Sequence, residues 1–167
     1  MVIFRPTSSL AAKMGLKIAA TPLRSETRLG DWYAKDIRLG TRHMVLCVNE
    51  LSRLAVVMDG APYASIPERF PAAVRQLLEA TVPSTKEIEL ELAAMQTISI
   101  AKTSSRSVLG SMNEYELMLG YMRDFEPNTG SMNLLNLSLK LSDSPTSTVT
   151  EFSPKLAAIR LLSARTK

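Results

Sequence analysis

The sequence predicts an α+β fold with a single pair of layers, in which a mainly antiparallel sheet of about five to six strands packs against about four to five helices. Three observations support this prediction. Several apolar segments alternate with period two, other segments repeat apolar residues with a period near 3.6, and short turns separate them. A chain of 167 residues with no internal repeat and no long linker falls within the usual range for one domain. We therefore expect residues 1–167 to form a single domain.

The first third of the chain predicts a strand, a helix and then three strands. Residues 1–5 predict a short strand, and the hydroxyl residues that follow can cap a helical turn that runs to Leu16. A polar loop is expected over 21–30. Tight turns then separate strands at 32–39, 43–49 and 54–58. Consecutive strands joined by tight turns pair with each other, so this part predicts an antiparallel meander.

The middle of the chain changes to a helical period. Residues 70–81 place apolar side chains on one side of a helix that Pro83 ends. Ser84 begins a capping box for a second helix that continues to Met95. Residues 87–92 also alternate as a strand would, but their Glu and Leu residues are strong helix formers, so we predict a helix there.

The last third predicts two strands and two helices. Residues 97–102 alternate as a strand, and apolar residues over 108–122 recur at helical spacings. A loop is expected over 127–130. Leucines at 135–141 then alternate with polar residues, which is typical of a half-buried antiparallel strand. Ser153 and the proline after it begin a closing helix.

Composition narrows the classes of function. Hydrophobic residues make up 46% of the chain and charged residues 22%, which favours a folded protein over a disordered one. The net charge is +4, but the basic residues stand singly, which favours a solvated surface over a nucleic-acid footprint. No segment approaches the ~18 consecutive apolar residues of a membrane span, and residues 1–6 lack the pattern of a secretory signal. We therefore expect a cytoplasmic protein with no membrane partner.

The chain contains one histidine and one cysteine, His43 and Cys47. A metal site with several such ligands is therefore excluded, and neither a metal nor a cofactor is expected. Four strand residues separate the two side chains by about 13 Å, which is too far for a thiolate–imidazole pair. We therefore predict no catalytic residues and favour a protein that is not an enzyme. We expect Cys47 to be buried, where it acts as a small hydrophobic residue.

One segment has the composition of an anion site. It joins a predicted strand to a predicted helix and consists of Lys102, Thr103, Ser104, Ser105, Arg106 and Ser107. Free amides at a helix start, hydroxyl groups and two cations are what a phosphate or carboxylate requires. The alternative is structural: the hydroxyl residues cap the helix, and Arg106 pairs with an internal acid such as Asp31.

A second candidate, for a pocket or an interface, is formed by Asp31, Trp32 and Tyr33 at the start of the hairpin, together with Asn113. A tryptophan is usually a core residue, but an acid beside two aromatic residues can also line a pocket or anchor an interface. Gly110 and Gly120 lie inside a predicted helix, where each costs about 1 kcal/mol relative to alanine. Their presence suggests a close approach to a sheet, a ligand or another chain.

The same segments resemble an uncharacterised family of bacterial proteins, a domain of unknown function that is found on plasmids and other mobile elements. The resemblance rests on Leu29–Ala34 (Leu-Gly-Asp-Trp-Tyr-Ala) and Arg106–Asn113 (Arg-Ser-Val-Leu-Gly-Ser-Met-Asn). Shorter matches occur at 4–5, 48–50 and 101–103. The resemblance implies a mobile accessory gene and supplies no activity.

Three hypotheses of function follow. The first is a non-enzymatic binding or interaction module that recognises a protein or forms a homodimer. The alternative is a nucleic-acid-associated protein, nuclease-like or part of a toxin–antitoxin pair, that places Lys102 and Arg106 on phosphates. The third is an enzyme that acts on a small anion at 103–107 with an acid or base from Asp31, Glu50 or Glu114.

Overall fold

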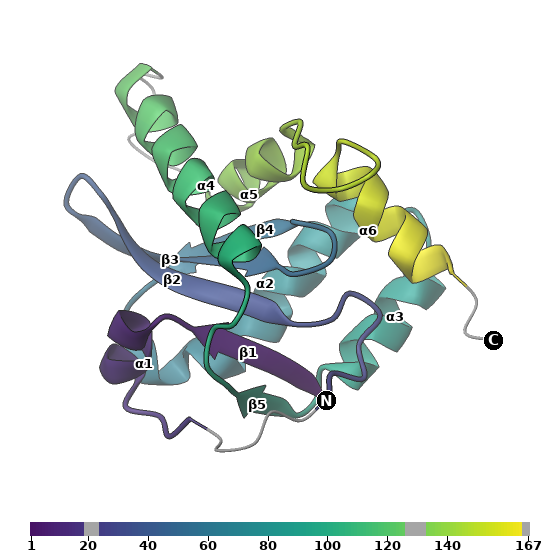
Figure 1. The fold of residues 1–167 in the computed structure, drawn as a ribbon, viewed down its shortest axis with the longest axis horizontal. Helices are drawn as coiled ribbons and strands as arrows, with labels where there is room; N and C mark the ends of the chain where they lie inside the picture. Colours follow the sequence, from purple (N-terminus) through teal and green to yellow (C-terminus); the bar gives the residue numbers. More distant parts are fainter. Residues whose placement is uncertain (19–23, 126–132, 165–167) are drawn as a thin grey trace.

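A computed structural model describes residues 1–18, 24–125 and 133–164. Its centre is a five-stranded sheet in the order β4-β3-β2-β1-β5 (Figure 1). The strands are β1 (Val2–Pro6), β2 (Trp32–Leu39), β3 (Arg42–Asn49), β4 (Ala55–Asp59) and β5 (Ile98–Ile100). The predicted α+β class is confirmed, and so is the antiparallel meander of β2, β3 and β4. The loop predicted over 127–130 lies outside the described residues, as does the first part of the loop over 21–30.

The sheet is mixed, which corrects the prediction that it is mainly antiparallel. Strand β1 runs parallel to β2 on one side and to β5 on the other. Strand β1 is followed by helix α1 (Ser8–Met14), so the chain leaves one end of the sheet and β2 begins at the other. Connections of this kind produce parallel neighbours, whereas tight turns produce antiparallel ones. The sequence showed the turns but not the order of the strands.

Hydrophobic layers lie on both faces of the sheet, which corrects the expected single pair of layers, and the described residues form six α-helices instead of the expected four to five. One face packs against α1, α2 (Ile66–Thr81), α3 (Thr85–Ala94) and α6 (Pro154–Ser163), and the 3₁₀ turn η1 (Tyr63–Ser65) precedes α2. The other face packs against α4 (Arg106–Phe125) and α5 (Leu134–Asp143). Alternation along β2 directs Trp32 to the first layer and Tyr33 to the second. Phe70 of α2 meets the Trp32 ring edge-on at 5.4 Å in the first layer.

Residues 135–141 form helix α5, so the predicted strand is wrong. Leu137 and Leu141 point into the second layer, as residues four apart on a helix do. Ser138 and Ser142 lie along the outer edge of β4, where their hydroxyls accept the backbone N–H groups of Val57 (2.8 Å) and Ala55 (3.2 Å). The leucine alternation therefore belongs to a helix that covers a sheet edge, and an edge covered in this way is closed to pairing with another chain.

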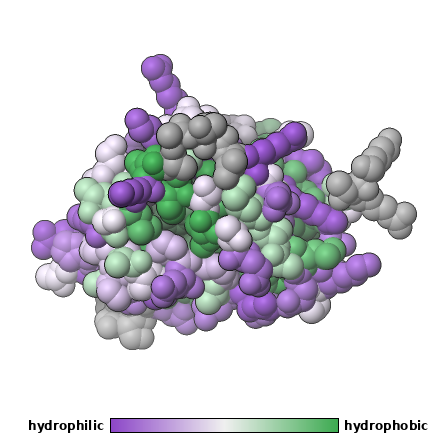
Figure 2. All heavy atoms as spheres, turned by 90° about the horizontal axis from the view of Figure 1, so that it is seen from below, coloured by the Kyte–Doolittle hydropathy of each residue, from purple (hydrophilic) through white to green (hydrophobic). Residues whose placement is uncertain are grey.

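The opposite edge of the sheet is the three-residue strand β5. Figure 2 shows the molecule from this side, with hydrophobic surface near the middle of the face and hydrophilic side chains around it. Ile98 and Ile100 of β5 are half-buried and pack against the first layer. Within residues 1–18, 24–125 and 133–164, no helix is both long enough and apolar enough to cross a membrane.

Candidate functional site

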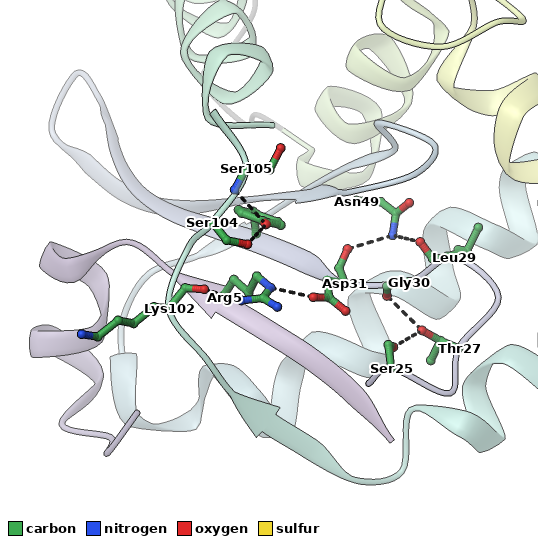
Figure 3. A network of polar contacts seen from close by, with 11 residues as sticks. Arg5, Ser25, Thr27, Leu29, Gly30, Asp31, Asn49, Lys102, Ser104 and Ser105 are labelled. Carbon is green, nitrogen blue, oxygen red and sulfur yellow. Dashed lines mark hydrogen bonds and ion pairs between the residues drawn. The ribbon is translucent and has the colours of Figure 1, made fainter. Parts of the chain in front are cut away.

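Polar side chains gather on the sheet face that carries α4, over strand β1. Helix α4 packs on β2 and β3, and α5 packs on β4, so neither helix covers β1. Instead, the coil 101–105 crosses this strand before it enters α4 (Figure 1). The start of β2 and the turn after β3 lie beside it (Figure 3). Segments that are distant in the sequence therefore meet at one place.

Arg5 is at the centre of this cluster (Figure 3). Its Nε donates to Asp31 Oδ2 at 2.6 Å, and its Nη1 donates to the backbone carbonyl of Lys102. The side chains of Arg5 and Asp31 are only 12% and 11% exposed, so solvent screens this ion pair weakly. The guanidinium also lies 5.8 Å from the centre of the Tyr33 ring. Arg5, and not Arg106, is therefore the partner of Asp31.

The hydroxyl residues before α4 mainly hold the helix in place. Tyr33 shares a 3.0 Å hydrogen bond with the Ser104 hydroxyl and accepts the Ser105 N–H at 3.2 Å. Ser105 caps the helix, because its Oγ accepts the Val108 N–H at 3.3 Å. The structural role that the sequence offered for these serines is thus present. Thr103 is half-buried beside them.

A buried asparagine shapes the loops on the other side of the cluster. The Asn49 amide donates to the carbonyls of Leu29 and Asp31, at 2.9 and 3.2 Å. Its Oδ1 accepts the N–H groups of Leu51 and Ser52 and the Ser52 hydroxyl. One side chain therefore ties the start of β2 to the turn after β3, and that turn carries Glu50 and Arg53.

Arg53 is the most unusual residue of this turn. It has a left-handed backbone (φ 63°), and it is 7% exposed. Its Nη2 donates to the Ser107 hydroxyl at 3.1 Å, and its carbonyl accepts the Tyr115 hydroxyl at 3.0 Å. Its Nε is buried and has no hydrogen-bond partner within the part of the chain that the structure describes. A nearly buried cation therefore lies at the start of α4 with a donor still free.

Glu50 interacts electrostatically with Asp31 and with both arginines. Burial raises the pKa of its carboxyl group, and the nearby charge of Asp31 raises it further, against the effect of Arg5 and Arg53. Its backbone N–H donates to the Asp31 carbonyl at 2.9 Å. For Arg53, burial lowers the pKa. Glu114, another acid considered from the sequence, is exposed on α4.

The structure unites some of the predicted residues and separates others. Asp31, Tyr33 and the serines at 104, 105 and 107 belong to the cluster, and Lys102 and Arg106 are exposed at its border. Trp32 is a core residue on the opposite face, and Asn113 lies on the outside of α4, where its Oδ1 accepts from Lys35 Nζ.

Sequence reasoning missed Arg5 and Arg53. Arg5 stood within one of the short matches to the resembled family, whereas Arg53 carried no signal, because an L residue with positive φ cannot be recognised from its neighbours. No group of three or more potential metal ligands occurs among the described residues.

A comparison with protein-family models decides the family. Residues 3–156 match the model of DUF6933, a domain of unknown function. This chain belongs to the DUF6933 family. A search of curated proteins found no match. The resemblance to an uncharacterised family is therefore confirmed, and within this DUF6933 domain both the Arg5–Asp31 pair and Arg53 lie inside the matched residues.

Proposed function

We propose that the protein is a non-enzymatic binding module that holds an anionic group, a phosphate or a carboxylate, at the start of α4. The observation that carries this proposal is Arg53, which is nearly buried and has an Nε without a partner in the described chain. Its Nη2 contacts Ser107 in the first turn of α4. The first amides of a helix have no partner inside it, and the helix dipole favours negative charge at this end.

The balance of charge supports an anion at this position. Arg5 is paired with Asp31, so these two charges largely cancel. The raised pKa of Glu50 makes its negative charge less favourable than that of a solvated carboxylate. Glu50 is therefore a weaker counter-charge for Arg53 than a solvated carboxylate would be, and exposed Lys102 and Arg106 add positive potential at the border. A bound anion would supply both negative charge and an acceptor for Nε.

Binding is favoured over catalysis because the cluster lacks a nucleophile–base pair. The described residues of the cluster form no Ser–carboxylate hydrogen bond, and Cys47 is fully buried in the first layer, where burial raises the pKa of its thiol. As the wider setting we propose a mobile-element accessory protein of the bacterial cytoplasm. The family resemblance supports the first part, and a free, buried thiol suits a reducing compartment.

The test is thermal unfolding in the presence of inorganic phosphate, citrate and nucleotides. A ligand at 100 times its Kd adds about 2.7 kcal/mol to the free energy of unfolding. We expect a rise in Tm that weakens in Arg53→Lys and Ser107→Ala but persists in Arg75→Gln, a matched control on the exposed surface of α2. Equal shifts in all these variants, or no shift with any anion, would refute the proposal.

Nucleic acid is the competing ligand, since Lys102 and Arg106 are both exposed on one segment. Contacts with a phosphate backbone weaken steeply as salt is added. If short RNA or DNA binds with this salt dependence, and Lys102→Gln with Arg106→Gln abolishes the binding while Arg53→Lys does not, the nucleic-acid function is correct and the small-anion site is wrong.

A further inference from the structure

Helix α4 presents a regular row of residues on its outer side. The row recurs at alternating spacings of four and three, which is the heptad pattern of a helix–helix contact. It consists of Arg106, Gly110, Asn113, Leu117, Gly120 and Asp124. All of these residues are exposed except Gly120, which is half-buried. Figure 1 shows α4 on the outside of the molecule, extending past the sheet.

The C-terminal half of this outer row carries exposed apolar side chains. Leu117 is 65% exposed, and Tyr121 and Phe125 next to the row are 64% and 77% exposed. The last two rings stack on each other with their centres 6.4 Å apart. Clusters of exposed apolar and aromatic side chains mark interaction sites more often than single ones do.

No described part of the chain requires glycine on steric grounds at these two positions of the outer row. A Cβ atom added at Gly110 or Gly120 would meet nothing within 4 Å among the described residues. Glycine weakens a helix relative to alanine, so both positions reduce the stability of α4 without relieving any contact in it. Close approach of a second helix backbone is a contact for which glycine is suited.

We infer that α4 pairs with α4 of a second copy of the chain, antiparallel, about a two-fold axis near residue 115. The outer row is symmetric about this position. Residue 110 lies opposite 120, so the two glycines meet, and Asn113 lies opposite Leu117. Arg106 lies opposite Asp124 of the second copy at each end of the contact. A C2 interface requires such self-complementarity.

Charge favours this orientation over the parallel one. In a parallel pair Arg106 would face Arg106 of the second copy, and like charges placed opposite each other repel. In the antiparallel pair it faces Asp124, whose Oδ1 also accepts from Arg123 of its own chain at 2.7 Å, so an acid lies between two guanidinium groups at each end. The interface is small, so we expect a dimer that dissociates on dilution.

The test is sedimentation equilibrium of the full chain over a range of concentrations. Gly120→Gln and Leu117→Gln should shift the protein to monomer without lowering its Tm, because neither side chain is needed inside the chain. Leu156→Gln, at an exposed leucine on α6, is the matched control and should leave the dimer intact. A chain that is monomeric at every concentration, or a dimer that both α4 variants leave unchanged, would overturn the inference.

Charge reversal tests the orientation. Arg106→Asp should weaken the dimer, and adding Asp124→Arg should restore it. Cysteines test the register: a mixture of Asn113→Cys and Leu117→Cys proteins should form disulfide dimers faster than either protein alone, because these positions face each other across the axis. Native Cys47 is fully buried and cannot compete. Faster cross-linking of Asn113→Cys alone would contradict the antiparallel arrangement.

Discussion

Replacing Asn49 with alanine should be among the most damaging single changes in this protein. Its side chain makes five hydrogen bonds and is 0% exposed. Each protein hydrogen bond contributes about 1 kcal/mol net, and a buried polar group left without a partner costs about 1–3 kcal/mol. Some of the freed groups will find water or have a second partner, as the Asp31 carbonyl does with the Glu50 N–H. We therefore expect a loss of about 3–5 kcal/mol.

Urea and thermal unfolding measure this loss. For a domain of this size, 1 kcal/mol corresponds to about 2–4 °C, so the Tm should fall by roughly 6–20 °C. Asn49→Asp keeps the volume but cannot donate to the two carbonyls, so it should be similarly damaging. Asn136→Ala, at an exposed asparagine on α5, is the control. A loss below about 1 kcal/mol in both Asn49 variants would refute the view that this side chain holds the site loops together.

Three further predictions concern buried polar groups. Burial raises the pKa of Glu91 above the ordinary 4.5, so the folded chain binds this proton more tightly than the unfolded chain. Stability should therefore fall as the pH rises from 4.5 through the raised pKa, and Glu91→Gln should flatten this slope in urea titrations; identical slopes would contradict it. Ser142→Ala leaves the Ala55 amide without its acceptor and should cost about 1–3 kcal/mol, with faster hydrogen exchange at that amide. Tyr33→Phe removes the acceptor of the Ser105 N–H and should cost about 1 kcal/mol in thermal unfolding; no measurable loss would mean that water replaces the phenol.

Helix and strand formation followed local signals where each element has one clear periodicity. Half of the capping box at Ser84 is present: the Ser84 Oγ accepts the Glu87 N–H at 3.4 Å, whereas the Glu87 carboxylate pairs with Arg28. The strand-like alternation over 87–92 is a helix as predicted. The opposite outcome at 135–141 has a physical cause. When leucines at alternate positions lie on a helix, every second one, such as Leu137 and Leu141, falls on the same face. The position of β4 decides that this face is the buried one.

The candidate site was predictable only in part. The hydroxyl-rich segment before α4 could be recognised because helix caps have a composition of their own, and the Asp31–Tyr33 segment was recognised by its aromatic residues and by the family resemblance. The partner of Asp31 could not be predicted, because Arg5 reaches it only through the parallel pairing of β1 with β2. The contacts of Arg53 are also tertiary, since its Nη2 donates to Ser107 and its carbonyl accepts from Tyr115, both on α4.

The sequence by itself determined the α+β class, the meander, most helices and the family, because periodicity, turns and caps act between residues that are close in the chain. Tertiary structure alone decided the parallel placement of β1, the helix over the β4 edge and the meeting of Arg5, Asp31, Glu50 and Arg53 at the start of α4. These features depend on which elements lie side by side. Burial and long-range pairing set that arrangement, and local sequence does not record it.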